Sequence, residues 1–130
     1  MIDREKSAIL KDMEHYFGYL YERGFKIRAI EYSPQFNANW MAKLESSKYA
    51  IYITSDRNHI LLECSPLPDN DVRKRISIEK LIYILSEGRD IIAPFKGNLA
   101  WGRKKQLERF SKLLNKYIEQ ITTYFDNRQN

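Results

Sequence analysis

The sequence predicts an α+β domain: an N-terminal helix, a four-stranded antiparallel meander, and two C-terminal helices packed on one face of the sheet. Apolar side chains recur every three or four residues near both ends of the chain, whereas they alternate with polar ones between residues 25 and 64. Only short polar turns separate the alternating segments. Parallel strands need crossovers of about a dozen residues, so neighbouring strands here are predicted to pair antiparallel.

Length and composition indicate one domain over residues 1–130. The chain has 130 residues, of which 43% are apolar, which suffices for one hydrophobic core. Cys64 is the lone cysteine, so no disulfide forms within the chain and a reducing cytoplasm is the expected compartment. No apolar run approaches the roughly 20 residues of a membrane-spanning helix, and no charged-then-apolar leader follows Met1.

Residues 4–23 are predicted to form the first helix. The apolar stripe consists of Ile9, Leu10, Met13, Phe17 and Leu20, at spacings of three and four. Asp3 is the expected N-cap, and Gly24 supplies the left-handed residue that commonly ends a helix.

The four strands are predicted from alternation with a period of two. In the first strand Phe25, Ile27 and Ala29 face the core, and Ser33-Pro34-Gln35 ends it. The next two strands cover residues 39–45 and 48–54, and the fourth covers about residues 59–64. Asn58 is expected to take a positive φ in the turn before the fourth strand.

A breaker segment at residues 65–71, rich in proline, aspartate and asparagine, is expected to end the sheet. Ser77 is the expected N-cap of the second helix, which Gly88 stops, and residues 89–102 are expected to be irregular. The final helix is predicted at about residues 103–125. Its apolar seam consists of Leu107, Phe110, Leu114, Tyr117, Ile121 and Tyr124.

Two apolar residues, Leu113 and Ile118, lie beside this seam and widen the apolar stripe of the final helix. We therefore expect the helix to pack on its own domain with one edge. The other edge is expected to meet a second copy or another protein, so a homodimer through the last helix is one predicted assembly.

No residue pattern points to catalysis, and the sequence predicts a protein that is not an enzyme. His15 and His59 lack a triad or nucleophile elbow around them, and the five glycines form no phosphate-binding loop. The spacing of histidine, cysteine and carboxylate residues matches no metal site, so neither a metal nor a cofactor is expected. Cys64 shares its parity with Ile60 and Leu62, which predicts a small buried hydrophobe.

Positive charge is concentrated in the C-terminal part of the chain. Residues 1–71 carry 9 basic and 11 acidic side chains, whereas residues 72–130 carry 13 and 6. The candidate partner-binding residues are Arg73, Lys74, Arg75, Trp101, Arg103, Lys104 and Lys105. Two interpretations of residues 103–105 stay open: cations and free amides at a helix start that hold an anion, or side chains that simply extend into solvent.

Four segments carry a resemblance to known proteins, over about residues 16–65. They are Tyr19-Leu20-Tyr21-Glu22-Arg23-Gly24-Phe25-Lys26-Ile27, Phe36-Asn37-Ala38-Asn39-Trp40, Leu44-Glu45-Ser46 and Ser55-Asp56-Arg57-Asn58. In these segments the chain resembles a loosely defined group of small bacterial α+β proteins of unassigned function, some of which look like immunity proteins of toxin systems. It has Asn37-Ala38 and Asn58 at places where that pattern has glycine. The resemblance implies an α+β fold and binding to another protein.

The expected function is therefore that of a non-enzymatic protein-binding module, most concretely an immunity or inhibitor protein. One alternative is a nucleic-acid-binding accessory protein that uses the basic C-terminal part. Another is a protein with a small-molecule or haem pocket, in which a histidine or Cys64 would hold the haem.

Overall fold

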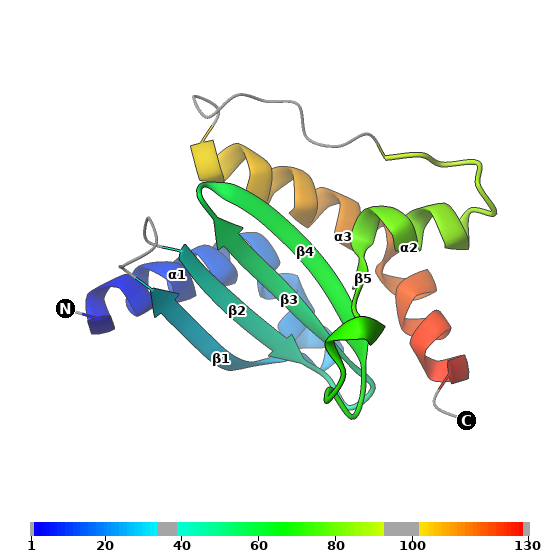
Figure 1. Cartoon of the computed structure of the whole chain (residues 1–130), viewed down its shortest axis with the longest axis horizontal. Coiled ribbons are helices and arrows are strands. Elements are labelled where there is room, and N and C mark those ends of the chain that lie inside the picture. The colour runs from blue at the N-terminus through cyan, green and yellow to red at the C-terminus, as the bar shows by residue number, and fades with distance from the viewer. Residues whose placement is uncertain (1, 34–38, 93–101, 129–130) are drawn as a thin grey trace.

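The computed structural model describes residues 2–33, 39–92 and 102–128, with side chains described from residue 4 to residue 127 within these ranges. A twisted antiparallel sheet forms one layer, and α1 and α3 cover one of its faces (Figure 1). The helices are α1 (Ile2–Phe17), α2 (Ile78–Leu85), α3 (Gly102–Arg128) and the short 3-10 segments η1 (Gly18–Arg23) and η2 (Val72–Lys74). The strands are β1 (Lys26–Ser33), β2 (Asn39–Glu45), β3 (Tyr49–Asp56), β4 (His59–Pro66) and β5 (Ile76–Ser77).

The sheet is the predicted antiparallel meander with one more strand than expected. Its order is β1-β2-β3-β4-β5, and β5 pairs with β4 through Glu63 opposite Ser77 and Cys64 opposite Ile76. Two residues are too few to produce an alternating pattern in the sequence. The prediction of four strands was therefore wrong by this short edge strand, while the antiparallel α+β class is confirmed.

The first helix is shorter than predicted. α1 begins at Ile2, ahead of the expected cap, and ends at Phe17; the chain then tightens into η1. A 3-10 turn is common at helix ends. Here the turn places the side chain of Leu20 in the core. Gly24 follows with a φ of +90°, which confirms it as the left-handed stop.

The predicted alternation in β1 fails after Ile27. A β-bulge between Ile27 and Ala29 shifts the register against β2, so Ala29 lies opposite Lys43 on the polar side of the sheet. Beyond the bulge it is Ile30 and Tyr32 that pack against the core. The expectation that Ala29 faces the core was therefore wrong, because one extra residue reverses the parity of every residue after it.

Two local predictions are confirmed by the backbone. Arg57 and Asn58 have φ values of +51° and +66°, as a two-residue hairpin turn between β3 and β4 requires. The Ser77 hydroxyl accepts a hydrogen bond from the Lys80 N–H, so Ser77 caps α2.

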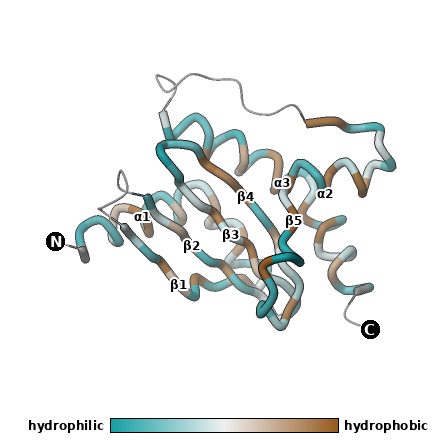
Figure 2. The backbone as a smooth tube through the Cα atoms, in the orientation of Figure 1, coloured by the Kyte–Doolittle hydropathy of each residue, from teal (hydrophilic) through white to brown (hydrophobic). Residues whose placement is uncertain are grey.

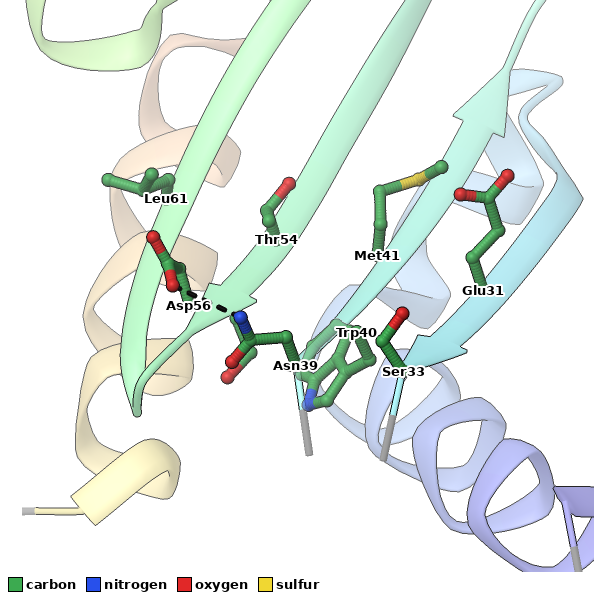
Figure 3. A pocket seen from close by; sticks show the side chains of 9 residues that line it. Glu31, Ser33, Asn39, Trp40, Met41, Thr54, Asp56 and Leu61 are labelled. Atoms are coloured by element: carbon green, nitrogen blue, oxygen red, sulfur yellow. Dashed lines mark hydrogen bonds between the residues drawn. The ribbon is translucent and has the colours of Figure 1, made fainter. Parts of the chain in front are cut away.

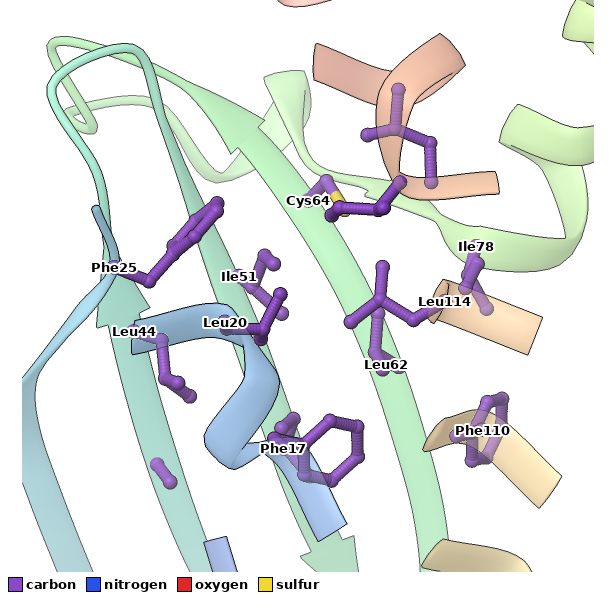
Figure 4. Packing of buried hydrophobic residues seen from close by; sticks show 14 of the residues in the cluster. Phe17, Leu20, Phe25, Leu44, Ile51, Leu62, Cys64, Ile78, Phe110 and Leu114 are labelled. Carbon is purple, nitrogen blue, oxygen red and sulfur yellow. The ribbon is translucent and has the colours of Figure 1, made fainter. Parts of the chain in front are cut away.

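The core lies between the sheet and the two long helices. Phe17 and Leu20 approach Leu44 and Ile51 from the α1 side, while Phe110 of α3 packs beside β4 (Figure 4). Apolar and polar stretches succeed one another along the strands and along α3 (Figure 2).

On α3 the predicted seam is buried from Leu107 to Ile121, but its last member differs. Phe125 is buried and Tyr124 only partly so. Ile118 also belongs to the core, with 1% of its surface exposed. This helix therefore buries a wider stripe within its own domain than the sequence predicted.

Candidate interaction surface

The face of the sheet opposite α1 and α3, called the outer face below, carries residues in two rows that cross the strands. The row called the open row consists of Glu31, Met41, Thr54 and Leu61, each directly opposite the next. The row called the covered row consists of Ala29, Lys43, Tyr52, Glu63 and Ser77, again in direct register. Side chains on one face of adjacent strands are neighbours, so each row is a contiguous strip.

Residues 66–75, called the strap, fold back over the covered row. The Asp69 carboxylate lies 3.0 Å from the Lys43 ammonium and accepts a 3.0 Å hydrogen bond from the Ser65 hydroxyl. The guanidinium of Arg75 lies 3.9 Å from the centre of the Tyr52 ring, and Tyr52 is only 4% exposed. The strap therefore removes Tyr52 from contact with any partner.

The open row has no such cover among the described residues. Leu61 is 48% exposed, and a shallow recess of about 330 Å³ runs along the row beside it. In Figure 3 the side chains of Leu61, Thr54, Met41 and Glu31 stand side by side on the same face. A second recess of about 210 Å³ lies on the other side of Leu61, where Ile92 contributes a further apolar side chain. Leu61 therefore stands between two shallow depressions, each lined by both apolar and polar side chains.

Carboxylates lie around Met41 and Leu61 of the open row. Glu31 ends the open row, Glu63 lies beside Leu61 in the covered row, and Glu79 lines the second recess. None of these three carboxylates forms an ion pair with any residue that the structure describes. The outer-face cation Lys43, by contrast, contacts both Glu45, at 3.3 Å, and Asp69. The two apolar residues of the open row, Met41 and Leu61, therefore have unpaired carboxylates around them, although the whole chain carries a formal charge of +5.

Two of the three predicted basic residues of the strap, Arg73 and Arg75, contact neighbouring side chains. Arg73 forms a forked pair with Asp71, with Nε to Oδ1 at 3.1 Å and Nη2 to Oδ2 at 3.2 Å. This pairing lowers the pKa of the Asp71 carboxyl. Arg75 lies on Tyr52, and Lys74 is exposed.

The basic residues at the start of α3 lie elsewhere. Arg103 contacts Asp12 of α1 at 3.1 Å, whereas Lys104 and Lys105 are exposed; Trp101 lies outside the described residues. The strap follows the C-terminal end of β4, and the start of α3 lies beside the opposite end of that strand (Figure 1). The structure does not bring the two predicted groups together, so binding of nucleic acid by all of them as one site stays a prediction that no contact supports.

The residues considered for chemistry are dispersed. His15 is exposed on α1 with its ring 4.6 Å from that of Tyr16, and His59 is exposed at the start of β4. Cys64 is fully buried, as predicted, and burial raises the pKa of its thiol. Among the described residues no three histidine, cysteine or carboxylate side chains lie close enough to hold a metal ion. The small-molecule or haem alternative stays a prediction.

The sequence contains one signal for the open row that periodicity alone does not reveal. Met41 and Leu61 are apolar residues at the polar positions of alternating strands, next to the buried Trp40 and Leu62. Alternation assigns such residues to the solvent side, where each is isolated in the sequence. Only the strand register shows that they belong to one row.

Within the described part of the chain, no helix combines the length and the apolar character needed to span a membrane. Comparison with known proteins adds no relative: no family model matches the chain, and neither a curated protein nor a solved structure does.

Proposed function

We propose that this chain is a non-enzymatic protein-binding module, most concretely an immunity or inhibitor protein, and that it binds its partner through the open row. The observation that carries the proposal is the position of Leu61. It is half exposed, it lies between two recesses, and it is aligned with Met41 and Thr54 on a sheet face that the strap leaves uncovered. The centre of a protein interface is typically apolar and its rim polar.

Both edges of the sheet are poorly suited to the addition of a partner's strand. On β1 the bulge after Ile27 and the exposed cations Lys26 and Arg28 disfavour pairing with another strand. On β4 the side chain of Gln106 accepts a hydrogen bond from the Ile60 N–H, and β5 pairs with the far end of the strand. A partner therefore has the face of the sheet available in preference to its edges.

The open row is also rigid enough for an inhibitor. Its residues alternate along the strands with Ala42, Ile53 and Leu62, which are fully or almost fully buried under α1 and α3. A preformed surface loses little conformational entropy on binding, and this favours tight association. The shallow shape of the recess fits a protein surface better than it fits an enclosed small molecule.

The test is capture of a partner from native extract by the wild-type chain and by Leu61→Asp. We expect one stoichiometric partner with the wild type and its loss with Leu61→Asp, because an aspartate on the strip would have to be desolvated in the complex. Val72→Asp, at an exposed apolar residue of η2, is the matched control and should retain the partner. If a toxin-like gene lies beside this one, its product is the first partner to test.

The proposal fails if the partner binds Leu61→Asp as well as it binds the wild type. It also fails if no partner is found while the purified chain turns over a substrate. Circular dichroism of both variants shows whether a loss of binding reflects a loss of fold.

A further inference from the structure

We infer that the partner of the open row is a basic protein surface with an apolar side chain projecting from it. This inference rests on the proposed function and adds the chemistry of the partner. It follows from the charges around Leu61 and from the shape of the surface on either side of that residue.

The unpaired carboxylates of this surface lie around the open row. Glu31, Glu63 and Glu79 surround the strip, and each lacks an ion-pair partner among the described residues. Asp56 lies at the end of the first recess, where it accepts a hydrogen bond from Asn39 at 3.1 Å and is paired with Arg57 at 3.4 Å. Complementary cations on a partner would gain from the three unpaired glutamates, whereas an acidic partner would be repelled by them.

The strap supplies a carboxylate to Lys43, the one cation among the five residues of the covered row. Without the strap, the Lys43 ammonium in the covered row would lie beside the open row with Glu45 as its only counter-ion among the described residues. Asp69 supplies a second carboxylate at 3.0 Å, and the Asp69 side chain is only 6% exposed. Asp69 thus offsets the charge of Lys43, while Arg75, also from the strap, lies over Tyr52 in the covered row. The carboxylates of this surface that stay unpaired among the described residues are those around the open row.

Two shallow recesses flank Leu61. They meet at Leu61, and each offers a further apolar side chain among polar ones, Met41 on one side and Ile92 on the other. An apolar side chain projecting from the partner can therefore lie against Leu61 in either depression. Carboxylates that remain at the border stay partly hydrated, so they select the partner and speed its encounter more than they add affinity.

The first experiment uses two synthetic peptides and isotope-labelled protein in an NMR titration. One peptide has lysines on both sides of a central tryptophan, and the other has glutamates in place of the lysines. We expect the cationic peptide to shift the amides of Thr54, Leu61 and Glu63, with a Kd on the order of 1 mM. The acidic peptide should leave these amides unchanged. Equal binding of both peptides, shifts located elsewhere, or no shift at all would overturn the inference.

A pair of charge-matched double variants separates local from overall electrostatics. Glu31→Lys/Glu79→Lys alters the border, and Glu14→Lys/Glu22→Lys makes the same change in net charge at exposed residues of α1 and η1 on the other side of the sheet. We expect about a fivefold loss of affinity for the cationic peptide in the first variant and little change in the second. Equal losses in both would show that only net charge matters and would overturn the inference.

The partner captured in the preceding test distinguishes the two proposals. A partner that needs Leu61 but binds Glu31→Lys/Glu79→Lys unchanged leaves the protein-binding function standing and overturns the basic surface. A partner indifferent to Leu61→Asp overturns the protein-binding site itself. If sedimentation instead shows self-association that Leu61→Asp abolishes, the strip binds a second copy and the inference of a basic partner is wrong.

Discussion

The side chain of Gln106 stands beside Ile60 where a neighbouring strand would otherwise pair. Its Oε1 accepts a hydrogen bond from the Ile60 N–H at 2.9 Å, and its Nε2 donates to the Asn58 carbonyl at 2.7 Å. Gln106 is buried, so α3 is fixed to the start of β4 by a primary amide that imitates the backbone of a strand.

Replacing Gln106 by leucine should lower the free energy of unfolding by about 1–3 kcal/mol, because the Ile60 N–H would stay buried without an acceptor. Urea denaturation measures this difference. Gln120→Leu, at an exposed position of the same helix, is the control and should change stability by less than about 0.5 kcal/mol. Equal effects of the two substitutions would show that Gln106 contributes no more than its helix propensity.

Periodicity could not reveal this contact. A 3.6-residue pattern identifies α3 and the stripe that it buries, and the observed helix agrees with the predicted one to within a few residues. Gln106 is a polar residue at the start of that pattern, next to the buried Leu107. Its role depends on the strand that it meets, which lies 46 residues away in the sequence.

The ion pair between Lys43 and Asp69 should couple the strap to the sheet. In a double-mutant cycle with Lys43→Met and Asp69→Asn, we expect Lys43→Met to lose about 1–2 kcal/mol, because it leaves the Asp69 carboxylate without a cation. Asp69→Asn should lose less, because Lys43 keeps Glu45 at 3.3 Å. The double variant should lose less than the two together. Urea denaturation supplies the four free energies, and strict additivity would contradict the coupling.

The candidate site was less predictable from the sequence than the fold. The strap was identified as a breaker segment, but its place over Tyr52 depends on a return path that no local pattern encodes. The bulge after Ile27 reverses which residues of β1 face the core. The alternation of apolar and polar residues before the bulge does not predict this extra residue. Register, rather than secondary structure, assembles the open row, and register is a tertiary property.

Stability should fall in alkaline solution as buried tyrosines lose their protons. Burial raises the pKa of Tyr19 to about 12, and its hydroxyl donates to the Ser111 carbonyl at 2.8 Å. The unfolded chain loses this proton near the ordinary pKa of about 10. The contribution of Tyr19 is therefore fully present below pH 10 and is lost as pH rises toward 12.

Urea denaturation between about pH 9 and pH 11.5 should show this decline, because the measurements begin below the unfolded-state pKa of about 10 and extend toward the folded-state pKa of about 12. Tyr19→Phe should make the decline shallower without abolishing it, because burial also raises the pKa of Tyr49. Tyr83→Phe, at an exposed tyrosine of α2, is the control and should leave the slope unchanged. The same slope in Tyr19→Phe and in the wild type would contradict the assignment.

The last prediction concerns the expected homodimer through α3. Ile118 was expected to lie beside the core seam and to face a partner, but it is 1% exposed and packs in the same core as Leu114 and Ile121. Ile118→Ala should therefore lower the free energy of unfolding by about 2–5 kcal/mol through the cavity that it leaves, whatever the state of assembly.

Leu113 is only partly buried and is the remaining apolar candidate for contact with a second copy. If the chain self-associates through this helix, sedimentation equilibrium at about 100 µM should show a dimer that Leu113→Lys converts to monomer. Lys116→Glu, on the exposed side of the same helix, is the control for altered charge. A wild type that stays strictly monomeric would reject the self-association and leave the predicted cost of Ile118→Ala unchanged.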